Sequence, residues 1–384
     1  MPQHFDYLLI GGGLQNSLLV QCLLELQPGA RIALVERDLQ LGGNHTWCFH
    51  AGDIPAGRIS TAIEPLVSFR WPGYEVRFPN RVREVEAQYC GVSSARLNQV
   101  VSSNLASAPG CELMTGAEAV EIGEHEVLLG DGRRITGELV VDGRGPLPGD
   151  YEGSAGYQKF VGLEIELASP HALTRPCLMD ATVEQIDGFR FIYTLPLSPT
   201  RLLIEDTYFS DNPDLDRPAL RKGIRDYAAS RGYAISSVER EEVGVLPMPW
   251  KDEIVEQSLG PLVAGYRGGW FHPGTGYSFP VALRLAAFIA SRPATSVFGE
   301  ELLALSTEHQ RQARYCHRLN AMLFRWFAPE DRWNVFERFY GLPEPLIRRF
   351  YALELNSTDR ARILIGKPPR GLSVRRGLAR RFVS

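Results

Sequence analysis

Two adjacent carboxylates, Glu205 and Asp206, end an apolar run that includes Leu203 and Ile204. A carboxyl group held among apolar side chains keeps its proton at neutral pH and can act as an acid. A solvated pair at the end of a strand is the other interpretation of the same residues. Because neighbours on a strand point to opposite faces, only one of the two carboxylates can face a given site. We therefore expect one candidate acid and one carboxylate in a supporting role or paired with an arginine.

Two glycines, Gly11 and Gly13, lie between an apolar run at residues 5–10 and an amphipathic stretch that begins at Leu14 and ends near Leu26. The run suits a buried parallel strand, and the stretch suits a helix. Glycines let the backbone approach a pyrophosphate, and the start of a helix offers N–H groups and a positive dipole. The pattern predicts a dinucleotide site with Gly11, Gly13 and Leu14 at the phosphates.

Glu36 follows a second short apolar run, residues 31–35. A carboxylate at this position can accept hydrogen bonds from ribose hydroxyls. Asn16 stands where the usual pattern has its third glycine, and we expect looser packing of helix on strand there. Strand, glycines, helix, strand and acid in this order favour a ligand site over a glycine turn without a ligand.

Three later segments favour FAD over NAD as the ligand. Residues 42–44 contain Gly43 and can form a second turn beside the cofactor. Residues 140–145, which include Asp142, resemble the second motif of glutathione-reductase-type flavoproteins. Residues 262–276 resemble the third motif of those proteins, in which a helix begins beside the flavin. The contacts expected in this third segment are at Gly265, Gly274 and Gly276.

Three residues near these motifs leave alternatives open. Tyr266 stands where related flavoproteins often have an acidic residue for the ribityl chain. His272 either contacts the flavin or takes part in proton transfer, or it is bound to backbone within its glycine turn. Arg96, on an expected helix at residues 93–105, either contacts the flavin or is a surface arginine.

The order of strands and helices predicts an α/β fold with a glutathione-reductase-type, Rossmann-like FAD-binding domain, an antiparallel β-sheet substrate domain and a helical C-terminal region. The strand-rich stretch after residue 160 indicates the antiparallel sheet, and the Arg-rich and aromatic-rich stretch after residue 301 indicates the helices. The expected boundaries are residues 1–60, 90–150 and 255–295 for the FAD-binding domain, 61–89 and 151–254 for the substrate domain, and 296–384 for the helical, membrane-proximal region.

Composition narrows the class of protein further. The six cysteines have no CxxC spacing, so we expect reduced thiols and no metal site. The net charge of −4 does not favour nucleic acid as a partner. We expect no signal peptide, because the N-terminal residues lack a basic region. No apolar run reaches the roughly 20 residues of a membrane-spanning helix, so we expect any membrane contact to be peripheral.

Longer blocks of the sequence resemble the bacterial lycopene β-cyclases, nearly from end to end. The blocks are residues 42–49, 76–79, 179–183, 193–208, 271–280, 338–343 and 363–369. The resemblance implies a lycopene β-cyclase, an isomerase of carotenoid biosynthesis that closes β-ionone rings by proton chemistry, giving γ-carotene and then β-carotene. It implies reduced FAD as the active cofactor without net redox change, and NAD(P)H as its reductant. By the same resemblance Glu205 is the acid or base, Asp206 supports it, and His272 is a further candidate for proton transfer.

The substrates implied by the resemblance, lycopene and other acyclic carotenoids, reside in the bilayer. The enzyme is therefore expected on the cytoplasmic side of the membrane as a peripheral protein, with other carotenoid enzymes as candidate partners. Residues 322–339 and the Arg-rich tail after Lys367 could contact lipid. The alternative is a helical cover of the flavin domain with a frayed tail. Two rival functions remain: a flavin-dependent isoprenoid or carotenoid oxidoreductase, and a non-catalytic lipid carrier of the same fold.

Overall fold

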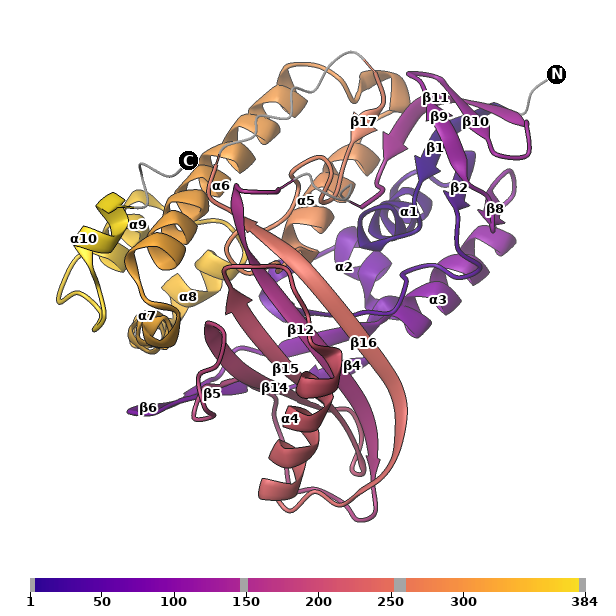
Figure 1. Ribbon diagram of the computed structural model, residues 1–384. Coiled ribbons are helices and arrows are strands. Elements are labelled where there is room, and N and C mark those ends of the chain that lie inside the picture. Colours follow the sequence, from indigo (N-terminus) through magenta and orange to yellow (C-terminus); the bar gives the residue numbers. More distant parts are fainter. Residues whose placement is uncertain (1–3, 146–150, 252–259, 380–384) are drawn as a thin grey trace.

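The computed structural model describes residues 4–145, 151–251 and 260–379, in which two large sheets are joined by a small sheet and a C-terminal group of helices (Figure 1). The first large sheet, here the nucleotide sheet, has the strand order β8-β2-β1-β11-β10-β9, with β17 also paired to β11. Its strands are β1 (His4–Ile10), β2 (Ile32–Glu36), β8 (Glu112–Thr115), β9 (Ala119–Ile122), β10 (Glu126–Leu129), β11 (Arg134–Asp142) and β17 (Leu262–Val263). β1 pairs in parallel with β2 and β11, which confirms the predicted strand–helix–strand unit.

Apolar side chains bury the nucleotide sheet on both faces. Its helices are α1 (Leu14–Leu26), α2 (Arg58–Ile63), α3 (Ser94–Ser107) and α5 (Phe279–Ala290). Tyr7 and Leu9 pack in the same core as residues of α1, α3 and α5, whereas Leu8 and Ile10 pack with residues of β9 and β10. A strand covered on both faces needs a nearly continuous apolar run, which explains the pattern at residues 5–10.

The second large sheet, here the substrate sheet, has the strand order β16-β12-β15-β14-β13-β5-β6. Its strands are β5 (Tyr74–Phe78), β6 (Arg81–Val85), β12 (Ala155–Leu167), β13 (Cys177–Asp180), β14 (Phe189–Pro196), β15 (Arg201–Ser210) and β16 (Ile235–Pro249). All neighbours are antiparallel except β13 and β5, which are parallel. The hairpin of β5 and β6, which comes early in the chain, therefore joins a sheet formed mainly by residues 155–249. The sheet is mainly antiparallel, as predicted.

The two faces of the substrate sheet pack against different partners. On one face, here the α4 face, Leu202 and Ile204 pack against α4 (Arg217–Ser230), which lies across the sheet in Figure 1. On the other, here the aromatic face, Leu203 and Phe209 pack in a cluster rich in aromatic rings, with Phe324 from the C-terminal helices. Strict alternation along β15 produces this division.

A small sheet of β3 (Thr46–His50), β7 (Tyr89–Ser93) and β4 (Phe69–Trp71) links the two large sheets. Two single-turn 3-10 helices, η1 (Ala51–Asp53) and η2 (Glu64–Leu66), flank it. β3 directly follows the glycine-containing residues 42–44, and Phe49 at its centre stacks on Phe279 of α5 at a centroid distance of 4.1 Å. The small sheet therefore ties the nucleotide-binding segments to the aromatic face.

The C-terminal region is helical, as predicted. Its elements are η3 (Ala294–Ser296), α6 (Glu300–Trp326), η4 (Pro329–Asp331), α7 (Trp333–Phe339), α8 (Glu344–Tyr351), α9 (Ser357–Leu364) and α10 (Val374–Ala379). Among the described residues, no helix is both long enough and apolar enough to span a membrane.

Residues 322–339, one of the two stretches considered for lipid contact, turn largely inward. Phe324 and Phe327 are buried, and Phe336 stacks on Phe189 of β14 at 4.3 Å. The guanidinium of Arg332 is fully buried and donates to the carbonyl of Phe209. These contacts favour the helical-cover alternative for this stretch. Of the Arg-rich tail, Arg380, Arg381, Phe382 and Val383 lie outside the described residues.

Candidate active site

The glycine turn between β1 and α1 leaves room for a ligand at the start of the helix. Gly11 has a φ of +90°, and a Cβ added there would lie 3.1 Å from the carbonyl oxygen of Gly143. A Cβ added at Gly13 would meet no atom within 4 Å, and no side chain caps α1. The first N–H groups of a helix, from Leu14 onward, have no partner within the helix. This open cradle of unpaired donors fits a pyrophosphate.

Glu36 lies at the end of β2 beside this turn, as the sequence predicted. Its carboxylate accepts hydrogen bonds from the backbone N–H of Gly12 at 2.6 Å and of Asp38 at 2.8 Å. Gly42 donates its N–H to the carbonyl of Gly12 at 2.9 Å, and Gly43 adopts a φ of +57°. The acid and the second glycine turn are therefore both fixed against the first glycine turn.

Asn16 packs tightly, so the expectation of a looser fit at the missing third glycine is wrong. Its side-chain amide donates to the carbonyls of Ile10 and Gly11, both at 2.9 Å. A Cβ added at Gly143 would lie 2.6 Å from the same amide nitrogen. The amide thus fills the space against Gly143 and joins α1 to the end of β1 by hydrogen bonds that a glycine could not make.

The second and third motifs meet at the end of β11, where Val141 and Asp142 pair with Leu262 and Val263 of β17. Asp142 is buried, and its carboxylate accepts from the Arg144 guanidinium at 2.9 Å and forms a longer ion pair with Arg267 at 3.4 Å. The Asp142 carboxylate is therefore held by two arginines.

The glycines of the third motif bend the chain towards the substrate sheet. Gly265 and Gly276 have φ values of +59° and +67°. A Cβ at Gly276 would lie 3.0 Å from the side chain of Leu246 and 3.5 Å from that of Gln158. At the position of the missing acid, Tyr266 stacks on Phe271 at 4.1 Å. The turn before α5 thus lies directly against β12 and β16.

His272 has both ring nitrogens bound to backbone. Nδ1 accepts from the N–H of Gly274 at 3.1 Å, and Nε2 lies 2.8 Å from the carbonyl of Phe350, to which it donates. Burial lowers the pKa of His272 to about 4, so the ring is neutral. With neither nitrogen free, these contacts favour the backbone-bound alternative over proton transfer.

Arg96 lies near the start of α3 and is partly exposed. Its Nε donates to the carbonyl of Pro65 at 2.8 Å, and one terminal nitrogen donates to Gln99. Its backbone N–H donates to the hydroxyl of Ser93, which caps the helix. Within the described part of the chain, no hydrogen bond or ion pair joins this guanidinium to another predicted site residue, and a flavin contact stays a prediction.

Glu205 lies on the aromatic face of β15, where it meets a second buried carboxyl group, that of Glu242 on β16. The two strands are not neighbours, because β12 runs between them. Both glutamates pair with the same residue of β12, Gly162. A Cβ added at Gly162 would lie 2.9 Å from Cγ and 3.3 Å from Oε1 of Glu242. The missing side chain leaves the space in which the two carboxyl groups approach each other closely enough to interact.

The environment of Glu205 favours its protonated form. Its side chain is 8% exposed, and the hydroxyl of Thr207 donates to one carboxyl oxygen. Burial raises the pKa of Glu205 to about 8, and the charge of Glu242 adds to the rise. Burial also raises the pKa of Glu242, while the neighbouring guanidinium of Arg240 opposes that rise. A proton held by this pair is thus available at neutral pH.

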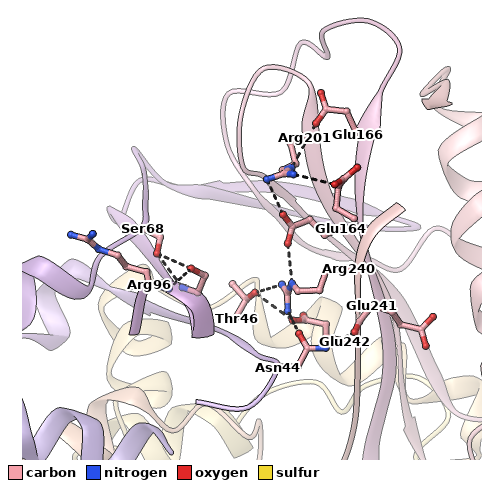
Figure 2. Close-up of polar contacts among 12 residues, drawn as sticks. Asn44, Thr46, Ser68, Arg96, Glu164, Glu166, Arg201, Arg240, Glu241 and Glu242 are labelled. Atoms are coloured by element: carbon pink, nitrogen blue, oxygen red, sulfur yellow. Dashed lines mark hydrogen bonds and ion pairs between the residues drawn. The ribbon is translucent and has the colours of Figure 1, made fainter. Parts of the chain in front are cut away.

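Arg240 joins the carboxyl pair to the segment that follows the second glycine turn (Figure 2). One terminal nitrogen donates to Glu242 and to the side-chain oxygen of Asn44, both at 2.8 Å. The other donates to the hydroxyl of Thr46 at 2.8 Å, and Nε donates to Glu164 at 2.9 Å. The backbone N–H of Gly42 is hydrogen-bonded to the carbonyl of Gly12. Residues 42–46 and Arg240 therefore connect the pyrophosphate cradle to the pair of carboxyl groups.

Asp206 faces the opposite side of the sheet and is paired with an arginine, as the alternation on a strand predicted. The guanidinium of Arg190 donates to both carboxylate oxygens, at 2.9 and 2.8 Å. Asp206 is fully buried beneath α4, where a Cβ at Gly223 would lie 2.5 Å from its carboxylate. This pair, with two hydrogen bonds, joins β14 to β15 under α4, on the face away from Glu205.

Aromatic side chains surround the acid on its own face. Tyr193 of β14 pairs directly with Glu205, and its hydroxyl donates to the sulfur of Cys48 at 3.2 Å. Nearby, the ring of His50 lies within 6 Å of four tyrosine rings, and Tyr277 donates a hydrogen bond to Asp53 at 2.9 Å. Of the aromatic residues close to the glycine motifs in sequence, Trp270 and Phe271 are buried, whereas Trp47 and Tyr277 are partly buried.

Sequence reasoning missed Glu242, Arg240 and Gly162. The acidic run that ends at Glu242 is followed by alternating apolar residues, a signal that one acid of the run lies inside a strand. Nothing in the sequence indicates that this acid meets Glu205, because the contact crosses a strand and depends on one glycine. Asp180 of β13 is a second buried carboxylate of this sheet, but it binds Thr182, Tyr227 and Arg231 and is structural.

A phosphate cradle at the parallel strands of one sheet, joined to a mainly antiparallel sheet with a buried acid, defines a two-sheet dinucleotide-binding fold. The chain belongs to the lycopene cyclase family, whose pattern matches residues 6–376. Lycopene beta-cyclase from Pantoea ananas is 42% identical over 375 residues, which cover 96% of each chain. Lycopene beta-cyclase from Pseudescherichia vulneris is 43% identical over 371 residues, covering 95% of this chain and 94% of that protein.

Solved structures share the fold at low sequence identity. A geranylgeranyl bacteriochlorophyll reductase-like protein from Thermoplasma acidophilum has a TM-score of 0.64 at 12% identity, with 96% of this chain and 98% of that chain covered. The p-nitrophenol 4-monooxygenase from Pseudomonas putida has a TM-score of 0.65 at 13% identity, with 92% and 99% covered. A probable FAD-dependent monooxygenase from Pseudomonas aeruginosa has a TM-score of 0.61 at 16% identity, with 88% and 99% covered. These likenesses confirm the predicted fold class.

Proposed function

We propose that this protein is a lycopene β-cyclase, which isomerises the acyclic ends of lycopene to β-ionone rings and so yields γ-carotene and then β-carotene. Its membership of the family and its 42–43% identity to bacterial proteins named lycopene beta-cyclase support the proposal. The observation that carries the chemistry is the buried carboxyl group of Glu205, with a pKa raised to about 8, on a face of aromatic and apolar side chains.

The reaction needs one proton at its start and releases one at its end. Glu205 donates its proton to the terminal double bond of the polyene, which leaves a tertiary carbocation. The electrons of the neighbouring double bond form the new carbon–carbon bond, and the cation moves into the ring. Loss of a ring proton to the Glu205 carboxylate then forms the ring double bond and restores the acid. The product is an isomer of the substrate, so no electrons are gained or lost.

The aromatic face supplies what a hydrocarbon substrate requires. A polyene offers no polar group to bind, so its end must be held by shape and apolar contact. The ring of Tyr193, opposite Glu205, presents π electrons on the side where the cation forms. Phe191 and Leu195, further along β14, continue the apolar surface. Exclusion of water from this face also protects the cation from hydration.

The glycine cradle fits FAD, and we propose that it binds FAD in the reduced form. Gly11, Gly13 and Leu14 would hold the pyrophosphate, and Glu36 would bind the ribose. Gly43, with the third-motif glycines at residues 265–276, would line the flavin end, next to β12 and β16. When bound, a reduced anionic flavin would supply negative charge that stabilises a nearby carbocation.

We propose NAD(P)H as the reductant that keeps the flavin reduced, and the cytoplasmic face of the membrane as the place of action, with the protein bound peripherally. Lycopene and related acyclic carotenoids lie in the bilayer, and other carotenoid enzymes there are candidate partners. Leu364 and Ile365 are 51% and 71% exposed, and α10 adds Arg375 and Arg376 close by in the chain. Exposed apolar residues next to arginines suit an anionic lipid surface.

The test is anaerobic turnover of lycopene in liposomes, in deuterated water, with chemically reduced FAD and no nicotinamide. The expected result is β-carotene that carries solvent deuterium, while the flavin stays reduced. An altered polyene with oxidised flavin and no ring would instead favour the isoprenoid or carotenoid oxidoreductase. Bound lycopene that is never converted, in a protein that keeps no flavin, would favour the lipid carrier.

A further inference from the structure

We propose that Glu242 is a positioning residue that, together with Arg240, keeps the catalytic proton on Glu205. The inference rests on the proposed function, because it explains how the acid of that reaction stays protonated at neutral pH. In this arrangement the two carboxyl groups share one proton unequally. Glu242 stays ionised against the guanidinium, and Glu205, without a cation of its own, carries the proton towards the aromatic face.

The two acids can meet because Gly162, the residue between them on β12, has no side chain. Residues on alternate strands of a sheet lie about 10 Å apart, which is two strand spacings. Two glutamate side chains can span that distance only if the residue between them has no side chain. Glu205 and Glu242 both pair with Gly162, and the carboxyl of Glu242 occupies the space beside its missing Cβ.

The position of the nearest cation explains which acid carries the proton. Arg240 donates to Glu242 and to Glu164, at 2.8 and 2.9 Å. Arg201 lies 3.4 Å from Glu164 and also pairs with Glu166 and Glu239, each at 3.6 Å. Glu242 therefore has the guanidinium of Arg240 directly beside it. Among the described residues, no ion pair joins Glu205 to a cation; the hydroxyl of Thr207 donates to its carboxyl group, and the charge of Glu242 lies beside it. Two adjacent carboxyl groups in a buried site cannot both be ionised, because their charges repel each other. The proton therefore stays on Glu205, the acid that has no arginine beside it.

Other titratable groups near the pair do not reverse this order. Asp206 is on the same strand but faces α4 and is neutralised by Arg190. The remaining groups, from the strands and the segment packed against the pair, are Tyr193 on β14, Cys48 on β3 and His45 before it. Burial raises the pKa of Tyr193 and of Cys48 and lowers that of His45, so all three are neutral near pH 7.

The test follows the protonation of Glu205 directly, in the flavin-loaded protein, by infrared spectroscopy as a function of pH. The carboxylic C=O band that disappears in Glu205→Gln reports this residue. In the wild type we expect the band to persist to about pH 8, as the pKa of Glu205 requires. In Glu242→Gln, which removes the neighbouring charge but keeps the volume, its midpoint should fall by about one pH unit or more. The pH above which cyclisation declines should fall with it, and turnover should recover at lower pH.

Glu241→Gln is the matched control, since Glu241 directly precedes Glu242 on β16 but its side chain points away from the network in Figure 2. It pairs instead with Arg221. This variant should leave the band and the pH profile unchanged. If Glu242→Gln does not fold, Glu242→Asp serves instead, with the same direction and a smaller shift. An unchanged Glu205 midpoint in the folded variant would overturn the inference. A wild type that forms no β-carotene at any pH would overturn the proposed function instead, and the infrared midpoint would still decide the role of Glu242.

Discussion

Glu205 and Asp206 are consecutive in the chain, yet their carboxyl groups lie on opposite faces of the substrate sheet. Glu205 meets Glu242 among aromatic side chains, and Asp206 meets Arg190 beneath α4. One residue therefore retains a proton that can react, while the other is an ionised structural group. Substitution of Glu205 should therefore affect catalysis, whereas substitution of Asp206 should affect the stability of the fold.

Glu205→Gln should abolish cyclisation while the fold and the flavin content are retained. The amide has nearly the volume of the acid but cannot deliver a proton, and general acid catalysis contributes about 10²- to 10⁴-fold. The measurement is β-carotene formation with reduced flavin, alongside the flavin absorbance of the purified variant. Normal turnover by this variant would show that the acid has been misassigned.

Asp206→Asn should reduce stability far more than it changes the pH profile of turnover. Loss of one partner leaves the buried Arg190 guanidinium uncompensated, which costs about 3–5 kcal/mol in comparable sites. Urea unfolding measures this loss. Asp226→Asn is the control, because Asp226 forms an exposed pair with Lys222, and it should change the unfolding free energy by less than about 1 kcal/mol. Equal effects of the two substitutions would contradict the assigned role of Asp206.

The raised pKa of Glu205 should make the folded protein less stable as pH rises. Between the ordinary pKa of 4.5 and about 8, the folded state holds a proton that the unfolded state has lost. Stability from this group is therefore complete below pH 4.5 and decreases by about 1.4 kcal/mol per pH unit up to pH 8. Glu205→Gln lacks this dependence. The difference in melting temperature between variant and wild type should increase from pH 5 to 8 and then level off. A constant difference would indicate an ordinary carboxylate.

Gly13→Val should prevent flavin binding without unfolding the protein. A side chain at Gly13 meets no protein atom within 4 Å, so it would enter only the space that the cofactor needs. Gly12→Ala is an instructive contrast, because its Cβ would lie 2.3 Å from the Leu41 side chain and should destabilise the protein directly. Bound FAD and the melting temperature of the flavin-free protein distinguish the two effects. Stoichiometric FAD in Gly13→Val would place the cofactor elsewhere.

Sequence patterns predicted the features that depend on local order. The glycine turns and the strand–helix–strand unit follow from patterns of glycine and apolar residues that repeat every two to four positions. The opposed directions of Glu205 and Asp206 follow from the alternation of side chains along a strand. The role of Glu242 could not be predicted, because its contact with Glu205 depends on the order of strands across the sheet, and local periodicity does not determine that order. The tight fit of Asn16 depends on Gly143, which is remote in sequence. Likewise, the inward turn of residues 322–339 follows from tertiary packing, since aromatic residues with arginines suit a lipid surface equally well.

The parallel pairing of β13 with β5 constrains how the chain can fold during synthesis. Met179 pairs with Val76, so the edge of the substrate sheet is formed by a hairpin that is made long before the strands it joins. Until those strands appear, the hairpin presents unpaired backbone groups, which invite association with other chains. Such remote pairing slows folding. A fragment from residue 151 onward therefore lacks the two strands that complete this sheet. A lower growth temperature, which weakens association between exposed apolar surfaces, should improve the yield of the whole chain.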